Sequence, residues 1–173
     1  MLDIYLQFDG SDVVGESKDA GHKKWIELKA FAHQILQPKS SSASNAGGFT
    51  SERTEHGEMY FTKEIDKATV KILRACSAGS VFKKVTASFN RAYGGASTAN
   101  AGQANRIEYF NIVLDNVVIS SVSMSIDGRT ELPHETIGLK YSKVVWTYEE
   151  QGVGGSKAGK TVASYNLATS EAG

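Results

Sequence analysis

Residues 154–161, GGSKAGKT, match the phosphate-loop pattern G-x-x-x-x-G-K-[ST] at each of its fixed positions. In a working site of this kind, the loop amides and the lysine bind nucleotide phosphates, and the hydroxyl binds Mg²⁺. Such a loop joins a buried parallel strand to a helix whose first amides point at the phosphates. Here the following residues, TVASYNLATSEAG, have little helical periodicity and contain no Asp for the metal. We expect a chance match and no cofactor, with an NTPase that uses Lys160 as a remote alternative.

The histidines and serines do not form a recognisable site either. The histidines show no helical metal-site spacing, and none is paired with a cysteine; they are His22, His33, His56 and His134. One group of serines is predicted to form the polar face of a strand and lacks the G-x-S-x-G pattern of a nucleophile; it comprises Ser120, Ser121, Ser123 and Ser125. The sequence therefore predicts no catalytic residue and no metal ligand, and we expect a protein that is not an enzyme.

The charge composition of the chain argues against some classes of binding partner. Lys and Arg together number 19, as do Asp and Glu, so the chain carries no formal net charge. A neutral chain has no field that attracts nucleic acid or an anionic membrane, and we expect neither partner.

The first residues, MLDIYLQFDG, lack the layout of a signal peptide, and no window is apolar enough for a membrane span. The single cysteine, Cys76, excludes an intrachain disulfide. We expect a protein made in the cytoplasm and not inserted into a membrane.

Alternating apolar and polar residues predict strands along most of the chain. These strands are expected at residues 2–8, 24–37, 59–65, 81–93, 105–126, 135–150 and 161–167. Residues 38–58 are rich in Ser, Gly and Asn and predict a long extended loop. The expected fold is mainly β: a β-barrel of two antiparallel sheets with one flanking α-helix and this extended loop. We expect one domain over residues 1–167 and a C-terminal tail over residues 168–173.

One helix is predicted, over about residues 66–78. Asp66 is suited to accept hydrogen bonds from the free amides of the first turn, and Gly79 offers a left-handed stop. Val70, Leu73 and Ala75–Cys76 follow helical spacing, so we expect them on the buried face.

Several stretches together resemble one family. They are GESKDAGH at 15–22, FTKEIDKATVKILRACSAG at 61–79, EYFNIVLDNVVISSVS at 108–123 and LKYSKVVWTYEEQ at 139–151. With this spacing, the chain from about Leu2 to Leu167 resembles the Hcp (hemolysin-coregulated) proteins of type VI secretion. The resemblance implies a two-sheet β-barrel with a helix alongside, a homo-hexameric ring, and rings stacked into a hollow tube. It also implies export through the type VI apparatus without a signal peptide, and contact with effectors, the sheath and spike or baseplate proteins.

The resemblance also implies roles for a few residues of this chain. Phe31, Ala32 and His33 occupy the place of the large-small-large residues on the ring's inner wall, which implies that they face the lumen and cargo. Many relatives have Ser where this chain has Ala32. SYNL at 164–167 resembles the family's terminal strand, with Tyr165 at the Trp position. The extended loop is suited to ring stacking, and its candidate residues are Ser40, Ser41, Ser42, Asn45, Gly47 and Gly48. A phage-tail-tube-like protein or another β-barrel binding module is the alternative.

Overall fold

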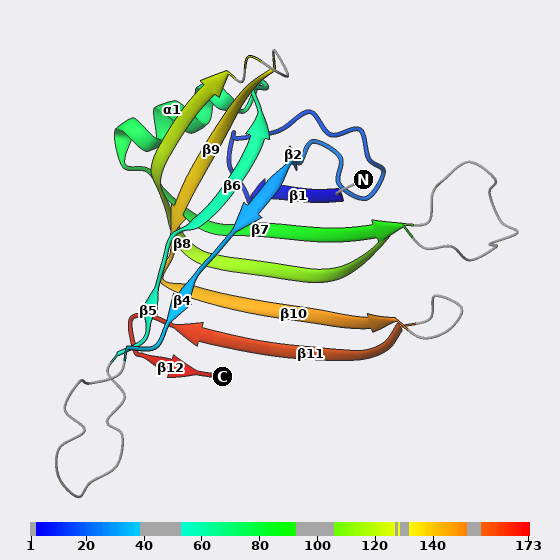
Figure 1. Cartoon of the computed structure of the whole chain (residues 1–173), viewed down its shortest axis with the longest axis vertical. Helices are drawn as coiled ribbons and strands as arrows, with labels where there is room; N and C mark the ends of the chain where they lie inside the picture. Colours follow the sequence, from blue (N-terminus) through cyan, green and yellow to red (C-terminus); the bar gives the residue numbers. More distant parts are fainter. Residues whose placement is uncertain (1–2, 39–52, 93–105, 127, 129–131, 152–156) are drawn as a thin grey trace, which may run out of the picture.

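The computed structural model describes residues 3–38, 53–92, 106–126, 128, 132–151 and 157–173. Strands make up most of the described chain and one α-helix lies among them (Figure 1). In chain order the elements are β1 (Asp3–Phe8), β2 (Ile26–Leu28), β3 (Ala30–Ala32), β4 (Ile35–Leu36), β5 (Glu55–His56), β6 (Met59–Glu64), α1 (Thr69–Ala78), β7 (Val81–Ala92), β8 (Arg106–Ile126), β9 (Pro133–Lys140), β10 (Lys143–Gln151), β11 (Lys157–Asn166) and β12 (Glu171–Ala172).

The strand pairs in the described chain are all antiparallel. They form a ten-stranded sheet and a separate two-stranded sheet of β4 and β5. One path of the large sheet runs β12-β11-β10-β8-β7-β1-β2, and a second runs from β8 through β9 and β6 to β3. The predicted mainly-β fold with antiparallel sheets and a flanking helix is confirmed, whereas closure into a barrel stays a prediction.

Strand β8 belongs to both paths because it bends at its middle. Its first half pairs with β7 and β10, and its second half pairs with β9. At the bend, Asn116 adopts a left-handed φ of 51°, a conformation that Asn tolerates better than most residues. The Asn116 side chain donates a hydrogen bond to Ser142 Oγ at 3.0 Å, in the turn between β9 and β10. The bend therefore sets the direction in which each path leaves β8.

The segment predicted as one strand over residues 24–37 is divided into β2, β3 and β4. Ile26 and Leu28 of β2 are buried, but the next core contact comes from Phe31, out of phase with them. The alternation breaks at Lys29, whose amide donates to the Thr62 carbonyl at 2.7 Å. Because of this break, β2 pairs with β1 while β3 pairs with β6. Periodicity alone could not locate the change of partner.

Helix α1 begins at Thr69, three residues later than expected. Asp66 lies in the preceding turn, where its Oδ1 accepts from the Ala68 amide at 2.8 Å and its own amide donates to Thr69 Oγ1 at 3.1 Å. Gly79 ends the helix with a φ of 62°, as predicted. The expected buried face was wrong at Val70, which is 71% exposed, because Thr69, Ile72 and Ala75 form the buried face instead.

A buried ion pair joins α1 to the sheet. Lys63 of β6 and Glu135 of β9 are 1% and 0% exposed, and Lys63 Nζ lies 2.7 Å from Glu135 Oε1. The same ammonium group contacts Asp66 Oδ1 at 2.8 Å and Thr69 Oγ1 at 3.1 Å. Thr69 also donates to Glu135 Oε1 at 3.0 Å. The start of the helix is thus held to β6 and β9 by charged groups inside the protein.

The predicted loop over residues 38–58 is shorter than expected at its C-terminal end. Glu55 and His56 form β5, which pairs with β4 through Leu36↔Glu55 and Ile35↔His56, and β6 follows at Met59. We call these two strands the β4–β5 hairpin; it lies at the opposite end of the molecule from α1, near β12 (Figure 1). In the predicted tail, Glu171–Ala172 add β12 to the edge of β11.

Candidate functional site

The end of the phosphate-loop motif lies in the middle of an antiparallel strand. On β11, Lys160 is opposite Glu149 and Thr161 is opposite Tyr148 of β10. A phosphate loop requires a helix that begins at these positions, so the local backbone has the wrong form for it. The prediction that TVASYNL belongs to a strand is confirmed, while residues 154–156 lie outside the described residues.

The predicted lumen residues point in different directions. Phe31 packs against the core, with its ring centroid 5.2 Å from those of Phe61 and Phe89. Ala32 is exposed, whereas His33 is partly buried and hydrogen-bonds through Nε2 to Tyr141 Oη at 2.9 Å. Their place on a ring wall stays a prediction. The candidate stacking residues lie outside the described residues; they are Ser40, Ser41, Ser42, Asn45, Gly47 and Gly48.

A cluster of histidine and aromatic side chains lies where the β4–β5 hairpin meets the large sheet. His56 Nδ1 lies 3.0 Å from Tyr141 Oη, so two imidazoles meet at one hydroxyl. On its other side His56 stacks on Tyr165 of β11, with a centroid distance of 4.6 Å and an angle of 15°. The Trp146 ring follows at 6.2 Å. We call His33, His56, Tyr141, Trp146 and Tyr165 the hairpin-root cluster.

Burial changes the proton affinities in the hairpin-root cluster. It raises the pKa of Tyr141 far above its usual value of 10.0, so the hydroxyl keeps its proton. Burial, together with the charge that His56 would carry, lowers the pKa of His33 below 6.5. Burial also lowers the pKa of His56 below 6.5. Both imidazoles are therefore neutral at pH 7. Sequence spacing gave no sign of this cluster, because its members come from distant strands.

A second polar network has the connectivity of a catalytic triad, but its serine is buried. Asp19 Oδ1 lies 2.9 Å from His22 Nδ1, and His22 Nε2 lies 2.9 Å from Ser88 Oγ. Ser88 is 0% exposed, and its hydroxyl donates to Glu108. A nucleophile must reach its substrate, so this arrangement serves structure. It holds the connection between β1 and β2 against β7, and His22 stacks on Tyr5 at 4.3 Å.

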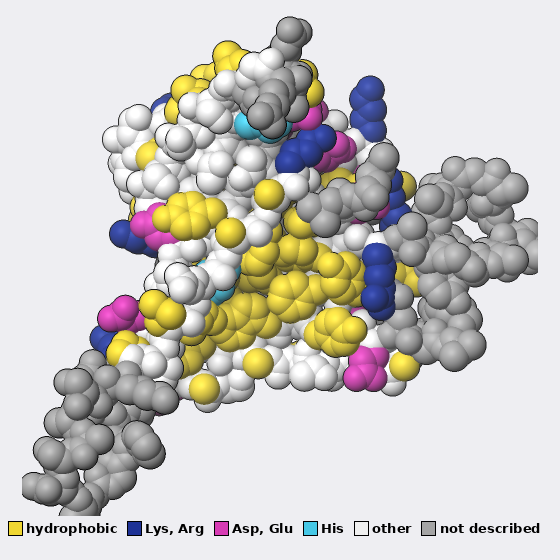
Figure 2. Space-filling model, viewed as in Figure 1, with side chains coloured by type: hydrophobic (Ala, Val, Ile, Leu, Met, Phe, Trp, Pro, Cys, Tyr) yellow, Lys and Arg dark blue, Asp and Glu magenta, His cyan; other side chains and the backbone are white. Residues whose placement is uncertain are grey.

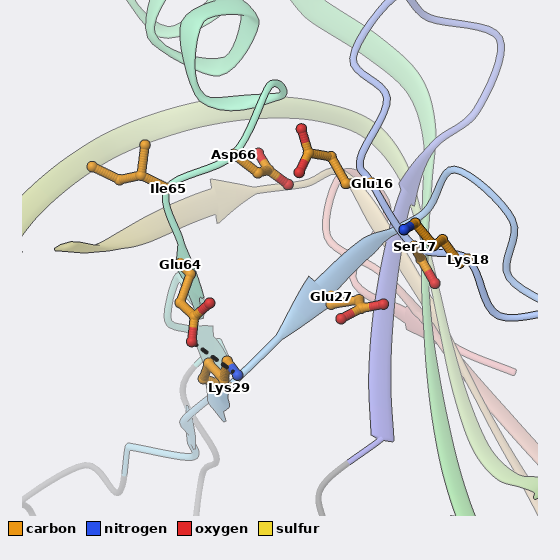
Figure 3. A pocket seen from close by; sticks show the side chains of 8 residues that line it. All are labelled: Glu16, Ser17, Lys18, Glu27, Lys29, Glu64, Ile65 and Asp66. Atoms are coloured by element: carbon orange, nitrogen blue, oxygen red, sulfur yellow. Dashed lines mark ion pairs between the residues drawn. The ribbon is translucent and has the colours of Figure 1, made fainter. Parts of the chain in front are cut away.

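A pocket of about 340 Å³ lies between the connection after β1, strand β2 and the segment from β6 to α1 (Figure 3). Half of its lining residues are acidic; the lining comprises Glu16, Ser17, Lys18, Glu27, Lys29, Glu64, Ile65 and Asp66. Lys29 and Glu64 form an ion pair at 3.0 Å, and Asp66 is already bound by Lys63. The remaining carboxylates make this pocket unsuited to phosphate or another anion.

One face of the large sheet is apolar and partly open. Hydrophobic side chains fill a hollow over β7, β8 and β10 (Figure 2). In register across these strands, Phe110 lies between Phe89 and Tyr148, and Ile112 lies in the neighbouring row beside Trp146. Burial decreases toward β10, where Tyr148 is 42% exposed although Phe89 is only 6% exposed. Such an uncovered apolar margin is typical of a surface that contacts another protein.

Among the described residues, no group of three or more His, Cys, Asp or Glu side chains is placed to hold a metal ion. No helix in the described part of the chain is long and apolar enough to cross a membrane.

Comparison with known proteins gives the family. The family described as "Type VI secretion system effector, Hcp" matches residues 5–148. The chain belongs to the Hcp family. It is 30% identical to Protein hcp1 of Pseudomonas aeruginosa over 93% of this chain and 91% of that protein. It is 27% identical to the Major exported protein of the same organism over 84% of this chain and 81% of that one.

The fold agrees with this membership. A solved structure of a type six secretion system protein is similar to the whole chain, with a TM-score of 0.84, 26% identity and 100% coverage of both chains. The Hcp family consists of type VI secretion proteins and is not an enzyme family. The predicted family is therefore confirmed.

Proposed function

We propose that this Hcp protein is a structural subunit of the type VI secretion inner tube. Six copies form a ring, rings stack into a hollow tube, and effector proteins travel inside it. The protein is made in the cytoplasm and leaves the cell through the type VI secretion apparatus. The observation that carries this proposal is the Hcp match over residues 5–148, together with a fold similarity that covers the whole chain.

The surfaces of the molecule support a ring. A closed ring of identical copies needs two different patches on each subunit that fit each other. Strand β12 ends the long path of the sheet, and the apolar margin at Tyr148 lies on β10 within that path. Exposed edges and apolar margins are surfaces that proteins cover by association. The zero formal net charge leaves little long-range repulsion between copies.

We also propose that the large sheet closes into a barrel at residues 26–32. This short segment pairs with β1 through β2 and with β6 through β3, so it connects the ends of the two paths that leave β8. Closure there would protect strand edges inside one subunit and leave the remaining edges for the ring.

The ring's inner wall is proposed to include Phe31, Ala32 and His33. Of these, Ala32 is exposed and small, so it is the one able to meet cargo without leaving a core contact. Without a hydroxyl at this position, contact with an effector would be apolar. The tube itself would meet the sheath along its outside and the spike or baseplate at its end.

An export experiment tests this function. The protein is tagged in its own bacterium and measured in culture medium, with the type VI sheath either intact or deleted. We expect the protein in the medium only with the intact sheath, while a cytoplasmic marker stays inside the cells in both strains. Equal amounts in the medium of both strains would contradict the proposal.

A further inference from the structure

We propose that the hairpin-root cluster is an acid-sensitive latch, which holds the β4–β5 hairpin on the large sheet when His33 and His56 are neutral and releases it when they are protonated. The hairpin is the part of the chain that leads into and out of residues 39–52. The latch follows from the geometry of one subunit, and only its effect on ring stacking depends on the proposed function.

The hydrogen bonds of the cluster meet at one hydroxyl. His33 Nε2 lies 2.9 Å from Tyr141 Oη and His56 Nδ1 lies 3.0 Å from it. The hydroxyl has one proton, so while both imidazoles are neutral it donates to one ring nitrogen and accepts from the other. In the latch we assign the acceptor role to His33 Nε2 and the donor role to His56 Nδ1. Each donor in this chain then faces an acceptor only while His33 is neutral.

A proton on His33 Nε2 breaks the chain. The ring then presents an N–H to the Tyr141 hydroxyl, so the hydroxyl proton loses its acceptor. A second proton places two positive rings 6.2 Å apart in a partly buried setting. His56 recovers some of this cost, because an imidazolium that stacks on Tyr165 gains a cation–π contact. For His33, the bond to the Gly57 backbone favours the proton, but burial and the charge on His56 outweigh it and lower its pKa. His33 is the principal trigger because its Nε2 is assigned as the acceptor of the Tyr141 proton.

Among the described residues, no carboxylate forms an ion pair with these rings. Burial and the charge on His56 lower the pKa of His33, and burial lowers the pKa of His56. Glu58 is engaged by Lys140 at 3.3 Å and by Ser120 at 2.8 Å. Other charged groups on the adjoining segments of the described chain include Arg53, whose guanidinium binds the Leu167 carbonyl, Glu55, Lys143, Glu149, Glu150, Lys157, Lys160 and Glu171.

Besides the cluster, the hairpin is held by its short ladder and by polar contacts near its ends, from Thr54 to Gln37 and from Arg53 to the Leu167 carbonyl. Its ladder consists of Ile35↔His56 and Leu36↔Glu55, extended by the bond from the Gly57 amide to the Gln34 carbonyl at 2.9 Å. The side chains of Ile35 and Leu36 are 44% and 48% exposed, so they bury little apolar surface. Isolated two-stranded hairpins are marginal in water. Loss of the cluster should therefore open the hairpin before the rest of the sheet.

The direction of the pH effect follows from linkage. Both pKa values are lowered in the closed form, and an open hairpin restores them to about 6.5. The closed form is therefore fully favoured above about pH 6.5 and loses stability as the pH falls below it. The open population can grow by up to about tenfold per pH unit for each proton that opening takes up.

Hydrogen exchange with mass spectrometry tests the latch on the full chain. Exchange of the peptides that contain Gln34–Gln37 and Arg53–Gly57, corrected for the intrinsic effect of pH, is compared at pH 7.5 and 5.5 with a β8 peptide as reference. In the unchanged protein we expect hairpin opening to rise by about tenfold or more while the reference stays constant. A constant opening ratio would overturn the proposal.

Variants assign the effect to the cluster. The double variant His33→Gln/His56→Gln keeps hydrogen-bonding groups that do not titrate, and we expect its opening to be independent of pH. His134→Gln is the matched control, because His134 lies on β9 opposite Glu64, and it should respond to acid like the unchanged protein. An acid response that persists in the double variant would refute the assignment. If that variant does not fold, NMR titration of the two imidazoles decides: values at or above 6.5 would refute the latch.

This test is independent of the tube. Hairpin opening is measured within a subunit, so it gives a result whether or not rings form. If rings form at pH 7.5 and the hairpin shows no acid response, the latch fails and the proposed function stands. If the hairpin responds to acid but no rings form, the latch stands and the proposed function fails.

Discussion

Replacing Lys63 by Met should cost the protein about 3–5 kcal/mol of unfolding free energy. The change removes the ammonium group that contacts Glu135 Oε1 at 2.7 Å, and Glu135 is 0% exposed. Among the described residues, its carboxylate would keep one hydrogen bond, from the Thr69 hydroxyl at 3.0 Å, because Glu135 Oε2 has no partner there. A buried carboxylate that loses its counter-charge is among the costliest single changes in a protein core.

The double variant Lys63→Met/Glu135→Leu should recover part of this loss. It removes both charges and fills the space with apolar groups, which is often close to neutral for a buried pair. Asp66 also contacts Lys63, but it is nearer the surface and still accepts from the Ala68 amide, so recovery should be partial. We expect a coupling free energy of about 2 kcal/mol between the two positions.

Urea unfolding followed by circular dichroism measures these changes, at one protein concentration for all variants because association adds to apparent stability. Lys29→Met is the matched control. It makes the same chemical change at the exposed Lys29–Glu64 pair, whose side chains are 54% and 43% exposed, and should cost less than about 1 kcal/mol. The prediction is refuted if Lys63→Met lowers the unfolding free energy no more than Lys29→Met does. It is also refuted if the free-energy changes of Lys63→Met and Glu135→Leu are additive, with no coupling between them.

Two further predictions concern the sheet and the phosphate-loop motif. Gly138→Ala should destabilise the protein by about 1–3 kcal/mol, because the new Cβ would lie 2.3 Å from Ser121 Oγ and 2.7 Å from Glu58 Oε2. A thermal melt measures this, and an unchanged midpoint would show that the backbone moves easily there. Lys160→Ala should change stability by less than about 0.5 kcal/mol, since Lys160 is exposed on β11. Calorimetric titration of the unchanged protein with ATP and Mg²⁺ should show no heat of binding, and binding abolished by Lys160→Ala would restore the nucleotide site.

Local signals in the sequence were reliable where one residue determines the backbone. Gly79 ends α1 in the left-handed conformation that its position predicts, and Asp66 binds the amide just before the first turn. The strand form of TVASYNL was also predictable, because its neighbours offered no helical spacing. Such features depend on contacts within a few residues, so a single sequence contains them.

Features that depend on strand register were not predictable. The change of partner at Lys29 arises because β1 and β6 compete for one continuous segment, which alternation cannot show. His33 and His56 looked unrelated in the sequence, yet the β4–β5 hairpin and the turn at Tyr141 bring them to one hydroxyl. The buried face of α1 shifted from Val70 to Ile72 because Thr69 is drawn inward by Glu135.

Negative-stain electron microscopy of the purified full chain at pH 7.5 tests the central claim most directly. The proposed tube subunit should give ring-shaped particles with six-fold symmetry and, at higher concentration, stacks of such rings. A mass measurement on the same sample should agree with six copies of the chain. A sample that remains strictly monomeric at high concentration, with no rings in the images, would contradict the account.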